Sequence, residues 1–400
     1  MRYVMKYNFD QIIDRRNTGG VKWDALENVF GTTDVLPMWV ADMDFAVAKP
    51  ITEALKKRIQ HEVYGYSQPL PTVTEIVVDR MKRKYGWKIK PEWVVFTPGV
   101  VPAIFTAVRA FTDPGDKVVL QGPVYRPFWS AITASSCRIL DNQLSLNNGR
   151  YEVDMGDLER KFRAKSKPKM MILCHPHNPV GRVWAEPELR LIGEIVVGNG
   201  AIMVSDEIHC ELLFNGYRHH PFASLSRDFA QNSITCMAPS KTFNLAGLCA
   251  STVIIPNKRI RDCFCNARAG FMGGTNAFGF TALEAAYRWG DEWLAQLMEY
   301  LQGNLEFVTR FFAEKLPGIK VVKPEGTYLV WLDCRGLGMT PRKLNDFLIK
   351  KAKVGLEDGR IFGPEGAGFQ RMNIACPRAT LKVALGRIER AVVEQVKSNK

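Results

Sequence analysis

The sequence predicts an α/β protein built on a mostly parallel β-sheet. Short apolar runs, which we expect to be strands, alternate with amphipathic segments of helical spacing. The runs are apolar almost throughout, which is typical of parallel strands covered by helices on both faces. The chain of 400 residues exceeds one ordinary hydrophobic core, so a second, smaller domain is also expected.

Seven apolar runs are the expected strands of a large domain that spans residues 46–288. They are residues 93–98, 117–123, 137–142, 169–176, 201–207, 233–239 and 251–256. Helices are expected at residues 51–62, 72–85, 101–111, 126–135 and 186–198.

From about residue 282 the pattern changes to one long helical stretch that reaches residue 316, followed by grouped strands and helices. The expected strands are residues 319–324, 327–334 and 369–375, and the expected helices are residues 341–353 and 379–395. Such grouping indicates an α+β domain. We therefore predict a smaller α+β domain made of residues 289–400 with an irregular N-terminal arm, residues 1–45.

Composition favours a cytoplasmic enzyme over several other classes of protein. The net charge is +13, but basic and acidic residues alternate at helical spacing, which predicts a solvated surface and no nucleic-acid partner. Nine cysteines without a Cys-x-x-Cys pair argue against a disulfide framework. The N-terminus lacks the apolar core of a signal peptide, and no uncharged run has membrane-spanning length, so no membrane association is expected.

Polar side chains follow the expected strands where ligands bind to open α/β sheets, at the carboxyl ends. They supply a Gly-led turn into a helix, an aromatic ring, an amide, a carboxylate, an imidazole and an amine. The motifs are "TPGVVPA" with Gly99, Val100 and Val101, "GPVYRPF" with Tyr125, "CHPHNPVGR" with Asn178, "SDEIH" with Asp206 and His209, and "APSKTF" with Ser240 and Lys241.

This set is what pyridoxal 5′-phosphate requires. A partly desolvated Lys241 can bond to the aldehyde and then act as a base. Asp206 opposite the pyridine nitrogen would keep that nitrogen protonated, and Tyr125 can stack on the ring. A helix that begins at residues 99–101 can bind the phosphate together with Ser240.

Each motif alone has an ordinary explanation, and only their order at successive strand ends favours a shared site. "SDE" is often a helix cap and Asn before Pro is usually a turn. A phosphate-binding P-loop would need glycines where the chain has Thr235 and Ser240, and no G-x-G-x-x-G follows a strand. The histidines and cysteines do not match a metal-binding spacing, so we predict no metal site.

Several segments together resemble the fold-type I, aminotransferase-like pyridoxal-phosphate enzymes. They are "VYGYSQP", "GVVPAIF", "HPHNPVGRVW", "SDEIH", "APSKTFNLAG" and "EGTYLVWLD". More narrowly, "WVADMDF" (39–45) and "DEIH" resemble the cystalysin and MalY/PatB carbon–sulfur lyases, the cystathionine beta-lyase group. The resemblance covers about residues 7–396 and implies an aminotransferase-like large domain.

The resemblance implies a role for each candidate residue. Lys241 would carry the cofactor and move the Cα proton, Asp206 would pair with the pyridine nitrogen, and Tyr125 would stack on the ring. Asn178 and His209 would lie near the ring oxygen.

The resemblance also implies substrate contacts and a homodimer. Arg371 in "RMNIACPR" would bind the substrate α-carboxylate, with Ala41 nearby. Tyr66 would contact the phosphate in the neighbouring subunit's site, with Tyr64 close to it.

Two positions depart from related enzymes. Cys249 stands where many aminotransferases have an arginine that pairs with the phosphate, although the lyase group lacks it too. Arg126 stands where cystalysin-like enzymes have a second tyrosine, which leaves the substrate preference open.

The implied reaction is β-elimination from cystathionine, cysteine or S-substituted L-cysteines, which gives a thiol, pyruvate and ammonia. An aminotransferase with the same site, and a regulatory protein that uses this fold to bind a partner, are the alternatives. The preferred sulfur amino acid, the pathway and any regulatory partner stay open.

Overall fold

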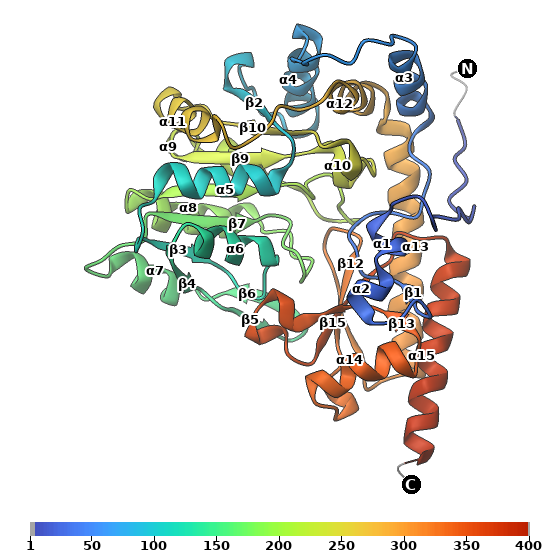
Figure 1. Cartoon of the computed structure of the whole chain (residues 1–400). Helices are drawn as coiled ribbons and strands as arrows, with labels where there is room; N and C mark the ends of the chain where they lie inside the picture. Colours follow the sequence, from blue (N-terminus) through green and yellow to red (C-terminus); the bar gives the residue numbers. More distant parts are fainter. Residues whose placement is uncertain (1–4, 399–400) are drawn as a thin grey trace.

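The computed structural model describes residues 5–398, and its largest sheet has seven strands in the order β2-β10-β9-β8-β7-β3-β4 (Figure 1). They are β2 (Val94–Thr97), β3 (Lys117–Leu120), β4 (Arg138–Asp141), β7 (Met170–Cys174), β8 (Ile202–Asp206), β9 (Ser233–Met237) and β10 (Ser251–Ile254). Neighbouring strands are parallel except at β10, which is antiparallel to β2 and β9. The predicted mostly parallel, seven-stranded sheet is confirmed.

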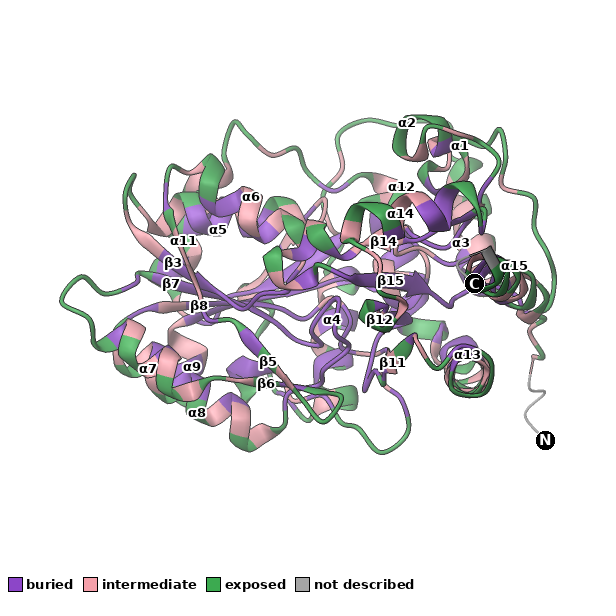
Figure 2. Cartoon of the chain, turned by 90° about the horizontal axis from the view of Figure 1, so that it is seen from below, coloured by how far each residue is buried: buried purple, intermediate pink, exposed green. Residues whose placement is uncertain are grey.

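Helices cover both faces of this sheet because its strands are apolar on both sides (Figure 2). Val118 and Ile172 belong to one buried cluster and Val119 and Met171 to another, as the alternation of side chains along a strand requires. One face carries α5 (Val100–Phe111), α6 (Arg126–Ala134) and α11 (Lys258–Arg268), and the other α7 (Met155–Arg163), α8 (Glu186–Gly198) and α9 (Arg227–Gln231). Beyond β2 and β10 pack α3 (Lys49–Ile59), α4 (Pro71–Tyr85) and α12 (Ala277–Trp289).

A second, antiparallel sheet has the order β11-β12-β15-β14. Its strands are β11 (Lys320–Val322), β12 (Leu329–Asp333), β14 (Glu357–Asp358) and β15 (Phe369–Asn373), with helices α13 (Asp291–Lys315), α14 (Pro341–Lys350) and α15 (Arg378–Ser398). From the N-terminal arm, β1 (Leu36–Pro37) pairs in parallel with β13 (Val354–Gly355). The domain boundaries at residues 46 and 289 stay predictions. No helix within residues 5–398 is long and apolar enough to cross a membrane.

The single helical stretch predicted for residues 282–316 is wrong in one respect, because two helices, α12 and α13, meet at Gly290. A Cβ at Gly290 would lie 2.4 Å from the Phe243 ring, so this close packing depends on a glycine. Elements that were not predicted include α1 (Val21–Asp24), α2 (Leu26–Phe30), α7, α9, α10 (Pro239–Thr242), α11, the short strands β1, β13 and β14, and the hairpin β5 (Leu144–Asn147)–β6 (Arg150–Val153). Most of them are too short for a periodic pattern.

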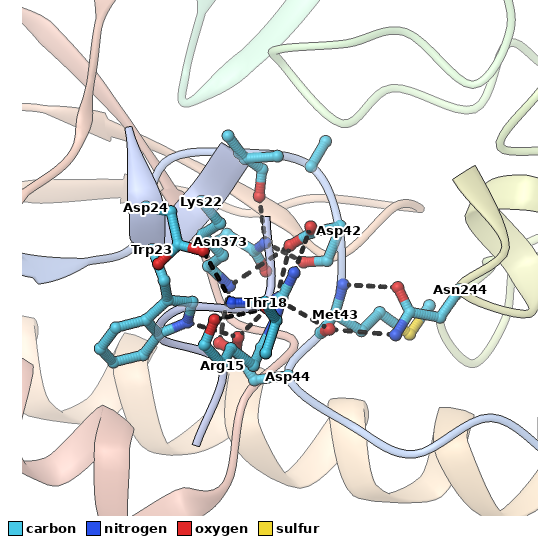
Figure 3. A network of polar contacts seen from close by, with 12 residues as sticks. Arg15, Thr18, Lys22, Trp23, Asp24, Asp42, Met43, Asp44, Asn244 and Asn373 are labelled. Carbon is cyan, nitrogen blue, oxygen red and sulfur yellow. Dashed lines mark hydrogen bonds and ion pairs between the residues drawn. The ribbon is translucent and has the colours of Figure 1, made fainter. Parts of the chain in front are cut away.

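Within the N-terminal arm, buried ion pairs attach residues 15–22 to the segment that follows β1 (Figure 3). The side chain of Lys22 is fully buried, and its Nζ lies 2.6 Å from Oδ2 of Asp44. Arg15 donates to Asp42 at 2.7 Å and to Asp44 at 2.8 Å. Two cations therefore balance two carboxylates.

Replacing Lys22 with Met should lower the free energy of unfolding by about 3 kcal/mol, because Asp44 would lose a buried partner. Lys6, which is exposed, provides the control, since Lys6→Met should change the value by less than about 0.5 kcal/mol. Urea unfolding measures both, and equal stabilities of the two variants would contradict this account of the arm.

Candidate active site

A cavity of about 210 Å³ lies at the carboxyl ends of β7, β8 and β9. Its wall contains ten of the predicted site residues, which come from six separate stretches of the chain. They are Ala41, Gly99, Val100, Val101, Tyr125, Asn178, Asp206, His209, Ser240 and Lys241. The fold therefore brings these residues together, while their individual roles stay predictions.

Lys241 lies in α10, directly after the fully buried strand β9. Its Nζ donates a hydrogen bond to the carbonyl oxygen of Ala41 at 2.6 Å. Burial lowers the pKa of Lys241 to about 8, even though Asp42 and Asp206 favour the charged form. The neutral, nucleophilic amine is thus much more populated near neutral pH than in an exposed lysine.

Asp206 is the last residue of β8 and is 4% exposed. One of its oxygens accepts a hydrogen bond from the N–H of Ile208 at 3.1 Å. Burial raises the pKa of Asp206 to about 7, with a smaller contribution from Glu207, while the Ile208 hydrogen bond and Lys241 oppose the rise. A cationic group in the cavity would restore its charge, which suits a protonated pyridine nitrogen.

His209 and Asn178 also line this cavity. Nδ1 of His209 is buried and has no hydrogen-bond partner within residues 5–398. Burial, Lys241 and Arg371 lower the pKa of His209 to about 3, so the imidazole is neutral. Oδ1 of Asn178 accepts from Nη1 of Arg371 at 3.0 Å, which leaves the amide NH₂ group as the donor toward a ligand.

The N-terminus of α5 forms another part of the wall and suits an anion. Gly99 is the N-cap residue, and no described side chain caps the helix. The first N–H groups of such a helix lack intrahelical partners and carry a partial positive charge. Ser240 and Cys249 line the same cavity.

Arg371 lies on β15 and is 3% exposed; it does not itself line the cavity, but it is hydrogen-bonded to Asn178, which does. Its Nη2 donates to the Trp39 carbonyl at 3.0 Å and to Glu357 at 3.1 Å. Its Nε is buried without a partner among the residues that the structure describes. A buried, unpaired N–H is costly, and a ligand carboxylate would satisfy it.

Tyr64, Tyr66 and Arg126 do not line this cavity. Tyr64 is 55% exposed and Tyr66 is fully exposed, and both line a separate hollow beside Phe278. A contact with the neighbouring subunit's site therefore stays a prediction. Arg126 is exposed at the edge of another hollow, next to Arg360.

Two side chains that adjoin the site were not predicted from the sequence. The hydroxyl of Tyr328 donates to the Ala41 carbonyl at 2.9 Å, and the motif "EGTYLVWLD" that contains it does not by itself indicate this contact. Glu357, the partner of Arg371, lies on the two-residue strand β14, which has no detectable sequence signal.

The model of the aminotransferase class I and II family matches residues 33–388. The chain belongs to this family.

Individual members of the family match over nearly their whole length. Cystathionine beta-lyase PatB of Bacillus subtilis (strain 168) is 46% identical over 386 residues, 96% of this chain and 100% of that protein. Protein MalY of Escherichia coli (strain K12) is 33% identical, over 96% of this chain and 99% of that protein. The structure of cystalysin from Treponema denticola, which contains pyridoxal 5′-phosphate, gives a TM-score of 0.95 with 38% identity, over 98% and 100% of the chains. The predicted resemblance and fold are confirmed.

The raised pKa of Asp206 predicts the pH dependence of stability in the cofactor-free protein. Between about pH 4 and pH 7 the folded state binds more protons than the unfolded state, so the free energy of unfolding falls as the pH rises. The Asp206→Asn variant should not lose stability in this way. Its free energy of unfolding at pH 8 should therefore exceed that of wild type by about 2–4 kcal/mol. Urea unfolding from pH 4 to pH 8 measures the difference in the free energy of unfolding between Asp206→Asn and wild type. A difference that becomes smaller as the pH rises would contradict the raised pKa of Asp206.

Proposed function

We propose that this protein is a pyridoxal-phosphate-dependent carbon–sulfur β-lyase. It would act on cystathionine, cysteine or S-substituted L-cysteines and release a thiol, pyruvate and ammonia. The observation that carries the proposal is the meeting of the Lys241 amine, the Asp206 carboxyl group and the uncapped N-terminus of α5 at one cavity. The likeness to PatB and cystalysin supports the choice of reaction.

The side chains around the cavity fit pyridoxal 5′-phosphate, which supplies an electron sink for negative charge at the substrate Cα. Asp206 would face the pyridine nitrogen, and the unpaired Nδ1 of His209 and the NH₂ group of Asn178 would face the ring oxygen. Tyr125 would lie against the ring. Gly99, Val100, Val101 and Ser240 would hold the phosphate.

Lys241 would perform the proton transfer. Its pKa of about 8 lies near the working pH, where a general base is most effective. The Ala41 carbonyl accepts one N–H of the free amine, which leaves the lone pair of the neutral form available for the Cα proton.

Arg371 would bind the α-carboxylate of the substrate. Asn178, Trp39 and Glu357 hold its guanidinium group in place, and its buried Nε lacks an acceptor. A planar guanidinium can hold a carboxylate through two parallel hydrogen bonds, which a lysine cannot do. Ala41, in the cavity wall, would lie near the same carboxylate.

Incubation with cystathionine should produce pyruvate, and Lys241→Ala should lower the rate by about 100- to 10,000-fold because the base is lost. The exposed Lys57 provides a control, since Lys57→Ala should keep the wild-type rate. A coupled pyruvate assay measures the three proteins. No pyruvate from wild type, or equal rates for wild type and Lys241→Ala, would refute the scheme.

Transfer of an amino group from alanine to a 2-oxo acid as the main reaction would instead support an aminotransferase.

We also propose that the protein is a cytoplasmic homodimer in which Tyr66 and Tyr64 reach the partner subunit's cavity. The high exposure of both rings and their position outside the cavity of their own chain support this arrangement. Tyr66 would add a phenol to the phosphate site, which has Cys249 at a position where an arginine is common in aminotransferases.

Mixing two inactive variants tests whether Tyr66 acts across subunits. Lys241→Ala and Tyr66→Ala should each have little activity alone. After unfolding and refolding together in equal amounts, half of the dimers should be mixed and contain one intact site, which restores about a quarter of the wild-type activity. The pyruvate assay measures the recovery, and no recovery from a mixture of folded dimers would contradict the proposal.

A further inference from the structure

Residues 39–45 ("WVADMDF") are called here the bridging segment. The main-chain carbonyl groups of this segment accept hydrogen bonds from the side chains of both Lys241 and Arg371. Lys241 donates to the carbonyl of Ala41 at 2.6 Å, and Tyr328 donates to the same oxygen at 2.9 Å. Arg371 donates to the carbonyl of Trp39 at 3.0 Å. The bridging segment therefore sets where the two side chains stand relative to each other.

On the side of β15, the bridging segment is held by Asn373 as well as by Arg371. The two residues are two positions apart on a strand, so their side chains lie on the same face. Nδ2 of Asn373 lies 2.6 Å from the carbonyl oxygens of both Val40 and Asp42. These bonds fix the carbonyl groups of the two residues on either side of Ala41.

On the side of Lys241, the bridging segment is held by Asn244 (Figure 3). Oδ1 of Asn244 accepts from the N–H of Met43 at 3.0 Å, and its Nδ2 donates to the carbonyls of Met43 and Phe45 at 3.0 Å each. Asn244 follows Lys241 by three residues and has a left-handed φ of 58°. The stretch of chain that carries Lys241 therefore also binds the bridging segment through Asn244.

The ion pairs of the N-terminal arm provide a third set of contacts that hold the bridging segment. Arg15 and Lys22 bond to Asp42 and Asp44, which flank Met43. Asp42 in turn favours the charged form of Lys241. A shift of the segment would therefore change both the hydrogen bond and the electrostatic environment of the amine.

We propose that Asn244 is a positioning residue for Lys241, which holds the Ala41 carbonyl against the free amine through the bridging segment. One N–H of the amine is directed to that carbonyl, and the lone pair is thereby aimed into the cavity. If the segment slides, the amine rotates away from the Cα proton. The inference rests on the proposed function of Lys241 as the base.

Asn244→Gly isolates the side chain, because glycine adopts a left-handed φ without strain and removes all three hydrogen bonds. Asn148→Gly is the matched control. Asn148 also has a left-handed φ, 49°, but it is exposed in the turn between β5 and β6, far from the polar contacts of the site. Both variants therefore make the same chemical change in the same backbone conformation.

Two measurements, made well below the unfolding temperature, test the proposal. In the cofactor-free protein, the acetylation rate of Lys241 by acetic anhydride, followed by peptide mass spectrometry, should rise several-fold in Asn244→Gly. In the cofactor-loaded protein, kcat for pyruvate formation per bound cofactor should fall about 10- to 100-fold, because the base is misplaced. KM should change much less than kcat, since Arg371 keeps its contacts with Asn178 and Glu357.

An Asn244→Gly protein that matches Asn148→Gly in acetylation rate and kcat would overturn the proposal. So would a raised KM with an unchanged kcat, because that pattern indicates altered substrate binding rather than a misplaced base. If wild type forms no pyruvate, the proposed function fails, while the acetylation rates still decide whether Asn244 positions the amine.

Discussion

The partial burial of one amine, that of Lys241, is the constraint around which the site is organised. A lysine at the end of a fully buried strand loses much of its hydration, and this loss lowers its pKa. The carbonyl of Ala41 and the carboxyl groups of Asp206 and Asp42 oppose the effect. As a result, a fraction of the Lys241 amine is neutral near neutral pH, and its hydrogen bond to Ala41 fixes its orientation. A nucleophile and base needs both properties.

The same balance of burial and pairing governs the charged groups that adjoin the site and the bridging segment. Arg371 is buried but faces Glu357, and Lys22 and Arg15 face Asp42 and Asp44. Each of these charges would be costly without its partner. Asp206 differs, because among residues 5–398 it has no ion pair within 4 Å, and burial outweighs the opposing charge of Lys241 and raises its pKa to about 7. The proposed cofactor would supply the missing partner of Asp206 through its protonated pyridine nitrogen.

Much of the fold and part of the site could be predicted because their signals are local. An apolar run marks a strand wherever it pairs, and the residues that end parallel strands meet at one edge of the sheet. Tyr125, Asn178, Asp206 and Lys241 were found in this way, and each lies in the cavity wall. The break at Gly290 was missed because it depends on the ring of Phe243, which is distant in the sequence.

By itself, the sequence determined the seven strands, their order of appearance and the side chains at their ends, since hydrophobic periodicity and strand-end chemistry are properties of short segments. Only the tertiary structure decided which distant segments meet there. Asn178 and Arg371 are 193 residues apart, and Asn244 holds a segment about 200 residues before it. These contacts depend on the packing of two sheets and an N-terminal arm, and no local pattern encodes that packing.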